Sequence, residues 1–138
     1  MIGDVKASLN AYVQSLNLRT HRHQVLASNI ANADTPHYKA RDFDFKTAFE
    51  TAVGRRDGMG RVSLSRTHDG HLQGVSGGPA AVNLQYRTET QSAVDGNTVD
   101  MDVERTQIAD NAMQYQIISQ FLSDRLRGMR TAISSNQG

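Results

Sequence analysis

The histidines are the first residues to consider for chemistry, because an imidazole can bind a metal ion or transfer a proton near neutral pH. His21 and His23 are two residues apart in a segment with helical periodicity, so their side chains point in different directions and do not converge on one ion. His68 and His71 flank Asp69-Gly70 in a glycine-rich stretch, where a metal site would need a third ligand that the sequence does not place. We therefore interpret the histidines as polar surface residues.

Two other patterns are similar to ligand-binding loops but do not complete them. Residues 95–104 carry carboxylates in an order like that of a calcium loop, yet the glycine stands second rather than sixth and the glutamate comes too early. Gly58-Met59-Gly60 lacks a third glycine and the Gly-Lys-Ser/Thr ending of a phosphate-binding loop. The sequence therefore predicts no enzyme activity, no metal site and no cofactor.

Composition narrows the function classes further. The chain has 138 residues, enough for one domain, and its 15 Lys+Arg against 14 Asp+Glu give a net charge of +1. That balance lacks the positive field of a nucleic-acid-binding protein. The absence of cysteine excludes disulfides, thiolate zinc sites and cysteine nucleophiles. Since no apolar run approaches about 18 residues, we expect neither a cleaved signal peptide nor a membrane span.

The first segment has the periodicity of a long helix. Its larger apolar residues recur in alternating steps of four and three: Val5, Leu9, Tyr12, Leu16, Leu26 and Ile30. Arg19 and His23 occupy two positions of the same stripe, where they weaken the apolar seam or specify a partner. Asp4 is a suitable N-cap, and a helix from there to about Ala31 would be about 40 Å long. It should end before Pro36, because proline disfavours the helical conformation of the preceding residue.

The last segment has the strongest periodicity. A heptad row and a companion row run through it: Met101, Ile108, Tyr115, Leu122 and Met129, with Ala112, Leu126 and Ile133. We predict a helix of about 50 Å over 100–133, with acidic residues in its first turns and Arg125, Arg127 and Arg130 complementing the macrodipole near its end. The predicted fold is thus mainly α, with two long amphipathic terminal helices pairing as a coiled coil.

The middle of the chain predicts only short elements. Phe45, Phe49 and Val53, four residues apart, favour a short helix before Gly54. Residues 54–81 hold most of the 11 glycines and are predicted to form a flexible insert. Alternating apolar residues at 82–86 predict a half-exposed strand within an extended arm, and a turn at 95–97 leads into the last helix. We therefore divide one domain into segments 1–53, 54–81, 82–99 and 100–138.

Two interpretations of the apolar stripes remain open at this point. The two helices could pair only with each other and bury a private core. However, apolar residues outside the main stripes widen the apolar surface beyond a single seam: Val13, Leu18 and Val25 in the first helix, and Ile117, Ile118 and Phe121 in the second. We hypothesise that both helices are weakly ordered in the monomer and become fixed when several copies or partners pack around them.

The stretch Ser28-Asn29-Ile30-Ala31-Asn32-Ala33-Asp34-Thr35-Pro36-His37-Tyr38-Lys39 resembles the signature of the bacterial flagellar axial proteins, the rod and hook group. Residues 40–45 and 95–104, together with the short length, look like the proximal-rod subunits of that group. The resemblance implies that the corner after the first helix is shaped by Ser28, Asn29, Ile30, Ala31, Asn32, Thr35, Pro36 and Tyr38. His37 departs from the usual glycine, and the positive φ of a type II turn is costly for histidine, so the local turn is open to change here.

The resemblance also implies a function. Such a chain would be a structural subunit of the proximal rod, a tubular drive shaft that transmits torque and encloses the export channel. It would leave the cytoplasm through the flagellar type III apparatus without a cleaved signal peptide and fold in the periplasmic rod. Its implied partners are other copies, rod proteins such as FlgC, the junction protein FliE, and export-gate and MS-ring proteins, with no nucleic acid and no membrane insertion.

The site of such a protein is its packing surface, because torque passes through many helix contacts rather than through one reactive group. We assign this interface to Leu9, Leu16, Leu26, Ile30, Ile108, Tyr115, Leu122, Met129 and Ile133. The competing class is a non-polymerising helical adaptor or secreted binding module, which stoichiometry would distinguish. A third class, a small hydrolase using His68 or His71, predicts activity that is lost when those residues become alanine.

Overall fold

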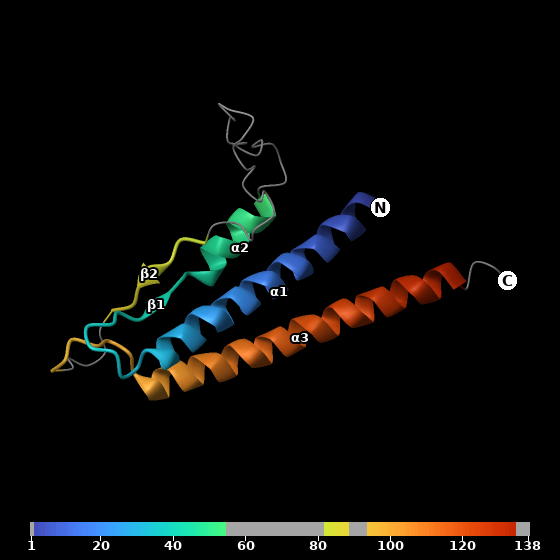
Figure 1. The fold of residues 1–138 in the computed structure, drawn as a ribbon. Helices are drawn as coiled ribbons and strands as arrows, with labels where there is room; N and C mark the ends of the chain where they lie inside the picture. Colours follow the sequence, from blue (N-terminus) through green and yellow to red (C-terminus); the bar gives the residue numbers. More distant parts are fainter. Residues whose placement is uncertain (1, 55–81, 89–93, 135–138) are drawn as a thin grey trace, which may run out of the picture.

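The computed structural model describes residues 2–54, 82–88 and 94–134. The elements in chain order are α1 (Ile2–Ala31), β1 (Arg41–Asp42), α2 (Phe45–Gly54), β2 (Gln85–Tyr86) and α3 (Met101–Ser134). The two long helices lie side by side and run in opposite directions, while α2 and the strands lie on the other side of α1 (Figure 1). Because α1 contacts α3, α2 and β1, it is the central element. The prediction of a mainly α fold with paired terminal helices is confirmed.

The boundaries of α1 agree with the prediction at one end only. The helix begins at Ile2, so the assignment of Asp4 as the N-cap is wrong; nothing in Ile2 or Gly3 prevents the first turn from extending further. It ends at Ala31 as predicted. The amide of Asn32 donates to the carbonyls of Ser28 and Asn29 at 3.2 and 3.1 Å, which tightens the last turn before the chain leaves the helix.

Aspartates start the other two helices. Asp44 Oδ1 accepts the Lys46 amide at 3.0 Å before α2, and Asp100 Oδ1 accepts the Asp102 and Val103 amides at 3.0 and 3.2 Å before α3. Each carboxylate thereby satisfies amides that the first helical turn leaves without a partner. Helix α2 occupies the predicted position. Helix α3 continues to Ser134, one residue beyond the predicted end.

The arginines near the end of α3 do not have the predicted electrostatic role. The last turn of the helix contains no basic residue, because Arg130 precedes Ser134 by four positions. The field of a helix macrodipole falls off within the last turn. Arg125, Arg127 and Arg130 therefore lie too early in the helix to owe their placement to it, and the expectation is corrected on this point.

The two strands form a minimal antiparallel sheet in which Arg41 is opposite Tyr86 and Asp42 opposite Gln85. The Arg87 amide extends the pairing by donating to the Ala40 carbonyl at 2.9 Å. A strand in the 82–86 region was predicted, but its partner β1 was not. The strand was expected to be half-exposed, but both of its residues, Gln85 and Tyr86, are exposed, Tyr86 to 71%.

The core is small and half polar. Its buried apolar residues are Leu18, Val25, Leu26, Ala40 and Phe43, and its buried polar residues are Ser15, Arg19, Asn29, Asn97, Glu104 and Asn111. These residues lie where the second half of α1 meets β1 and the first half of α3. Within the described ranges, no helix combines the length and hydropathy that crossing a membrane requires. From residue 55 onward the predicted insert lies outside the described ranges. The same holds for His68, His71 and the glycines at 58 and 60.

Candidate assembly interface

The predicted interface residues fall into three groups by burial. Leu26 is 0% exposed and lies wholly inside the single chain. Tyr115 and Ile133 remain 40% and 70% exposed. The others are half-buried along the facing sides of the two long helices: Leu9, Leu16, Ile30, Ile108, Leu122 and Met129. The structure thus brings most of them together as the seam of the helix pair, and that seam becomes less covered toward the end of α3.

A polar contact crosses the middle of this seam at Arg19, one of the two polar positions noted in the sequence. Asn111 Nδ2 donates to the Arg19 carbonyl at 2.9 Å, and the Arg19 guanidinium reaches Asn111 Oδ1 at 3.5 Å. The guanidinium also lies 3.7 Å from the ring centroid of Phe45 in α2. Burial and the nearby charge of Arg22 lower the pKa of Arg19. Arg19 therefore specifies a partner within the chain by fixing the register of three helices.

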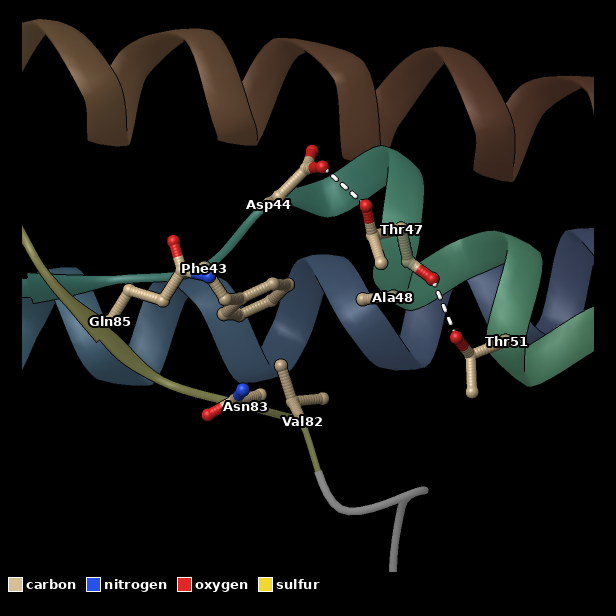
Figure 2. Close-up of a pocket in the computed structure, with 8 residues that line it drawn as sticks. All are labelled: Phe43, Asp44, Thr47, Ala48, Thr51, Val82, Asn83 and Gln85. Atoms are coloured by element: carbon tan, nitrogen blue, oxygen red, sulfur yellow. Dashed lines mark hydrogen bonds between the residues drawn. The ribbon is translucent and has the colours of Figure 1, made fainter.

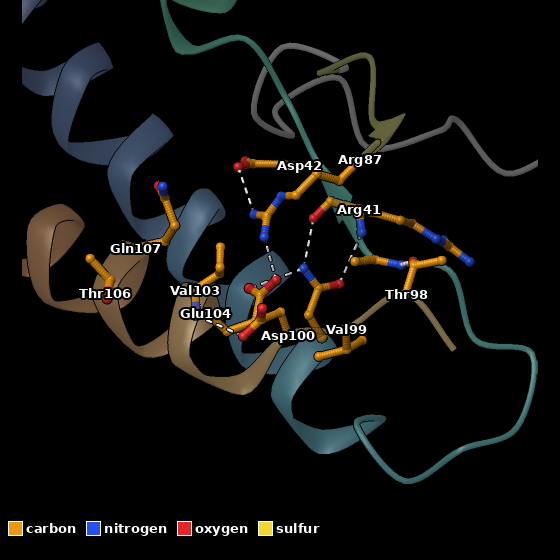
Figure 3. A network of polar contacts seen from close by, with 12 residues as sticks. Arg41, Asp42, Arg87, Thr98, Val99, Asp100, Val103, Glu104, Thr106 and Gln107 are labelled. Carbon is orange, nitrogen blue, oxygen red and sulfur yellow. Dashed lines mark hydrogen bonds and ion pairs between the residues drawn. The ribbon is translucent and has the colours of Figure 1, made fainter. Parts of the chain in front are cut away.

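Four charged side chains form a network closer to the corner, and Figure 3 shows three of them, Asp42, Arg87 and Glu104. Arg22 of α1 donates to both carboxylate oxygens of Asp42 in β1, at 3.0 and 2.8 Å, and to Gln107 of α3 at 2.9 Å. Arg87, next to β2, donates to Asp42 at 3.1 Å and to Glu104 of α3. The side chain of Glu104 is 0% exposed. Arg87 therefore ties the strand pair to the helix pair through a buried carboxylate.

The electrostatics of the two carboxylates differ. Burial is the largest influence on both and favours protonation. At Glu104 it prevails over the charge of Arg87 and the hydrogen bond from Asn29, so the pKa is raised above 4.5. At Asp42 burial is outweighed by hydrogen bonds from Arg22, the Phe43 amide and Arg87, and the pKa is lowered below 3.8. The hydrogen bond with Asp42 in turn raises the pKa of Arg22, against the effect of burial.

The signature residue Asn29 is the centre of the corner. Its Oδ1 accepts the Arg41 amide at 3.0 Å and its Nδ2 donates to the Arg41 carbonyl at 2.8 Å, as a neighbouring strand would. The same amide group also reaches Tyr38 Oη and Glu104 Oε2, both at 3.3 Å. A primary amide offers a donor and an acceptor together, which a carboxylate cannot do when ionised. This explains why asparagine suits the position.

The other signature residues act locally on the same corner. Asn32 Nδ2 donates to the Ser28 carbonyl at 2.8 Å, Thr35 Oγ1 lies 3.3 Å from Asn32 Oδ1, and Ser28 Oγ lies 3.4 Å from Tyr38 Oη. Ala31 and Pro36 are exposed, and Ile30 is half-buried in the seam. The placement of the motif at the corner agrees with the expectation. The contacts of these side chains within the described part of the chain hold the corner together.

Asn97, in the loop before α3, stabilises the corner with its side chain. Its buried Nδ2 lies within hydrogen-bond distance of three carbonyls, those of Asn32, Ala33 and Thr35, at 3.0, 2.7 and 2.9 Å. Its Oδ1 accepts the Val99 amide at 2.8 Å. Free carbonyls after the end of a helix need such partners when they are buried. The residues that resembled a calcium loop therefore fasten the start of α3 to the end of α1.

His37 retains the turn despite replacing the usual glycine. Its φ is 61°, the left-handed value that the turn requires, and the Tyr38 amide donates to the Thr35 carbonyl at 3.3 Å across the turn. Gly96, with a φ of 73°, packs against the ring: a Cβ added there would lie 2.9 Å from His37 Nδ1. The two residues with positive φ therefore face each other, one from each side of the corner.

The outer side of α3 carries large apolar residues that no described part of the chain covers. Met113, Ile117 and Phe121 follow one another at steps of four and are 55%, 49% and 57% exposed. Two of them were noted in the sequence as lying outside the main stripe. A contiguous apolar row on an exposed helix is typical of a surface that meets another protein.

A groove of about 360 Å³ lies between α2 and the arm that leads to β2 (Figure 2). Phe43, Ala48 and Val82 provide its apolar walls. Asp44 is occupied by its hydrogen bond with Thr47, at the start of α2. Because the Asp44 carboxylate also accepts the Lys46 amide, this pair belongs to the N-terminal cap of α2 and does not indicate a reaction.

The remaining histidines do not form a site in the described part of the chain. The His21 ring packs against Phe43 at 5.7 Å between ring centroids, while His23 is exposed. Among the described residues, no three His, Cys, Asp or Glu side chains are grouped so that they could hold a metal ion.

Comparisons with known proteins give the family. Residues 9–39 match the family model described as flagella basal body rod protein. The chain is 45% identical to the flagellar basal body rod protein FlgB of Escherichia coli (strain K12) over 98% of its own length and 99% of that protein. It is 43% identical to the FlgB proteins of Salmonella typhimurium, over 96% and 97%, and of Cereibacter sphaeroides, over 91% and 92%. The chain therefore belongs to the FlgB family and is a structural subunit of the flagellar basal body rod.

Proposed function

We propose that this subunit builds the rod through the exposed face of its helix pair, and that it carries no enzymatic activity. The single observation that carries the proposal is the uncovered row of Met113, Ile117 and Phe121 on α3. Three large apolar side chains at steps of four form a ridge that fits the groove of a second helix. A subunit that packs helix on helix with its neighbours would form the wall of a tube, transmit torque and enclose the export channel.

The seam residues have a supporting role in this proposal. Ile108 and Leu122 are half-buried between α1 and α3, so an aspartate at either position would place a charge in the packed seam. We expect such variants to be synthesised but to fail in rod assembly. The outer row, in contrast, offers a way to block assembly without disturbing the subunit itself. The hypothesis that both helices are weakly ordered in the monomer is narrowed here to their halves away from the corner, which neighbours would fix by covering them.

Membership of the family also suggests where the subunit lies, how it is exported and which proteins it contacts. The subunit would lie in the proximal rod in the periplasm, after export through the flagellar type III apparatus without a cleaved signal. Its neighbours would be other copies, FlgC, FliE and the export-gate and MS-ring proteins at the rod base. We infer that the segments 1–53, 54–81, 82–99 and 100–138 act as one domain, because the corner network joins the first to the last two.

The test compares Ile117→Asp and Phe121→Asp with Ser123→Asp. Ser123 is also exposed on α3, but two residues turn the helix by about 200°, so it lies on the other flank from Phe121. We expect all three purified variants to unfold within about 0.5 kcal/mol of the unaltered chain, because exposed substitutions rarely cost more. In cells that lack their own copy of the gene, Ile117→Asp and Phe121→Asp should abolish swimming and rod formation, and Ser123→Asp should not.

Two outcomes would contradict the proposal. Normal swimming with both Ile117→Asp and Phe121→Asp would show that the outer row does not meet a neighbour. A count of one copy per basal body, measured by fluorescence of a tagged chain, would favour the adaptor alternative, because a tube wall needs several equivalent subunits.

A further inference from the structure

The end of α3 projects beyond α1. The register of the pair is given by the contacts of Arg19 with Asn111 and of Arg22 with Gln107. Because the helices are antiparallel and rise equally per residue, Ile2 lies level with about residue 128. The last turn and a half of α3 therefore has no facing turn of α1 in the described part of the chain, and Figure 1 shows this end of α3 standing clear.

Seam positions continue through the last paired turn of α3 at Leu126 and into the projecting end at Ile133, and both are exposed in the described part of the chain. Leu126 and Ile133 follow Leu122 at four and eleven residues, the spacing that keeps them on the side of the helix that faces α1. They are nevertheless 49% and 70% exposed. The apolar stripe is thus longer than the helix that covers it.

The last turns of α3 are also cationic, both in the projecting end, which holds Arg130, and just before it, where Arg125 and Arg127 lie. Arg125, Arg127 and Arg130 are exposed, and among the described residues no ion pair joins them to a carboxylate. Asp124 is the acidic side chain beside them, and it accepts a hydrogen bond from Gln120 at 3.0 Å. Since the arginines precede the last turn, the macrodipole does not account for them either. We call residues 125–134 the basic tail.

The opposite end of the molecule has the complementary surface. Asp34, Asp95 and Asp102 are exposed around the corner, with Pro36 and Val94 exposed among them. Asp102 has a side chain that is 94% exposed and lies 3.8 Å from Arg105, an ion pair too open to neutralise it strongly. Lys39 and Arg41 are further cationic residues on this side, and both already have interactions: Lys39 has one of its own, and the Arg41 guanidinium lies 5.8 Å from the Tyr86 ring centroid. We call this surface the acidic corner.

We propose that the basic tail of one copy docks on the acidic corner of a second copy, head to tail. The apolar residues of the tail would cover Pro36 and Val94, while the arginines would meet the aspartates at the rim. Such a contact joins two different surfaces and leaves both ends of a dimer open, so it propagates instead of closing. This inference rests on the proposed assembly function, for which it names one partner and one contact.

Charge reversal tests the contact in solution. The tail variant carries Arg127→Asp and Arg130→Asp, the corner variant carries Asp34→Arg and Asp102→Arg, and a third chain carries all four. By sedimentation velocity at low salt, we expect each reversed surface to weaken self-association at least tenfold and the fourfold variant to recover most of it. Absence of self-association in the unaltered chain, or a fourfold variant no better than either parent, would overturn the second copy as the occupant.

Cysteine pairs test the same contact in the cell, since the chain has no cysteine of its own. Arg130→Cys with Asp34→Cys should give disulfide-linked oligomers on non-reducing gels of isolated basal bodies, because a bridge requires the two Cα atoms to lie within about 7 Å. Arg130→Cys with Glu50→Cys, on the exposed side of α2, is the matched control and should give none. Equal cross-linking in both, or none with the corner pair, would contradict the proposal.

The two proposals can fail separately. Loss of swimming in Ile117→Asp and Phe121→Asp with no effect of charge reversal would leave rod assembly intact as the function and remove only the head-to-tail contact. Normal swimming in the outer-row variants, together with self-association that the fourfold variant recovers, would remove the outer row as an assembly surface and leave the head-to-tail contact.

Discussion

The two halves of the helix pair are stabilised in opposite ways. At the corner, buried polar side chains such as Asn29, Asn97 and Glu104 have hydrogen-bond partners inside the chain. At the other end, apolar residues such as Phe121 and Ile133 face outward. The corner half can therefore hold its geometry in a single subunit, whereas the distal half has contacts left to make.

This difference suggests how one short chain can be both specific and adaptable. Buried hydrogen bonds require particular geometry, so the corner fixes the angle and register at which the helices leave it. Apolar contacts are tolerant of direction, so the distal half can pack against neighbours that differ in detail. Substitutions at the corner should thus change folding first, and substitutions at the distal half should change assembly first.

The largest effect on folding is expected from Asn29→Asp. The new carboxylate cannot donate to the Arg41 carbonyl, and it would face Glu104, whose Oε2 now lies 3.3 Å from the amide nitrogen. An unpaired buried charge beside another carboxylate should cost about 3 kcal/mol or more in the free energy of unfolding. Urea denaturation followed by circular dichroism measures it, with the exposed Ala27→Asp on the same helix as the control. Equal midpoints for the two variants would show that the corner is not buried as described.

The next largest effect is expected from Arg87→Met, which removes the link between the strand pair and α3. Glu104 would stay buried with Asn29 as its remaining partner, at a cost of about 2–3 kcal/mol. Adding Glu104→Gln should recover a large part of that loss, because no buried charge is then left without compensation. Arg105→Met, at an exposed arginine next to Glu104, should change the unfolding free energy by less than about 0.5 kcal/mol. Additive losses in the double variant would contradict the coupling.

The pH dependence of stability should separate the two carboxylates of this network. The pKa of Glu104 is raised by burial, so the folded state holds the proton more tightly and stability falls as the pH rises from 4.5 to the folded pKa. The pKa of Asp42 is lowered by its hydrogen bonds despite burial, so its contribution is present above 3.8 and is lost as the pH falls through the folded pKa. Denaturation midpoints measured across this range should show both slopes, and Glu104→Gln should remove only the upper one. If the fall in stability above pH 4.5 were unchanged in Glu104→Gln, that fall would have to come from another titratable group.

The long helices could be predicted because they depend on local signals, although α1 begins at Ile2 and not after Asp4. The heptad rows and the aspartates at 44 and 100 act within a few residues, and the structure places α2 and α3 accordingly. Strand β1 was missed because two residues carry no periodicity. The donor side chain of Asn97 was missed because its three acceptors lie more than 60 positions away in the sequence.

The candidate interface shows the same limit more sharply. A heptad pattern identifies which residues of a helix are apolar, but both a facing helix and a neighbouring subunit can cover them. Leu26 and Phe121 both belong to apolar rows, yet one is buried in the chain and the other is exposed. The two cases are separated by which side of each helix faces the other, and that orientation is fixed in part by the contact between Arg19 and Asn111, which are polar. Sequence periodicity therefore predicts which side of a helix is apolar, but not whether a facing helix or a neighbouring subunit covers it.

The smallest effect is expected at the pair of positive-φ residues, where Gly96→Ala should destabilise the corner by about 1–2 kcal/mol. Part of this cost is the positive φ itself and part is the close approach of the new Cβ to His37 Nδ1. Adding His37→Gly removes the second part only, so the double variant should recover some of the loss, and a double-mutant cycle should give a coupling of about 0.5 kcal/mol or more. Gly128→Ala is the matched control with the opposite sign: it lies in open space within α3, where alanine favours the helix by up to about 1 kcal/mol. Thermal denaturation of the four chains measures these differences. A coupling of zero would mean that the histidine ring moves aside freely, and the corner would then tolerate histidine in place of glycine without any dependence on the residue that faces it.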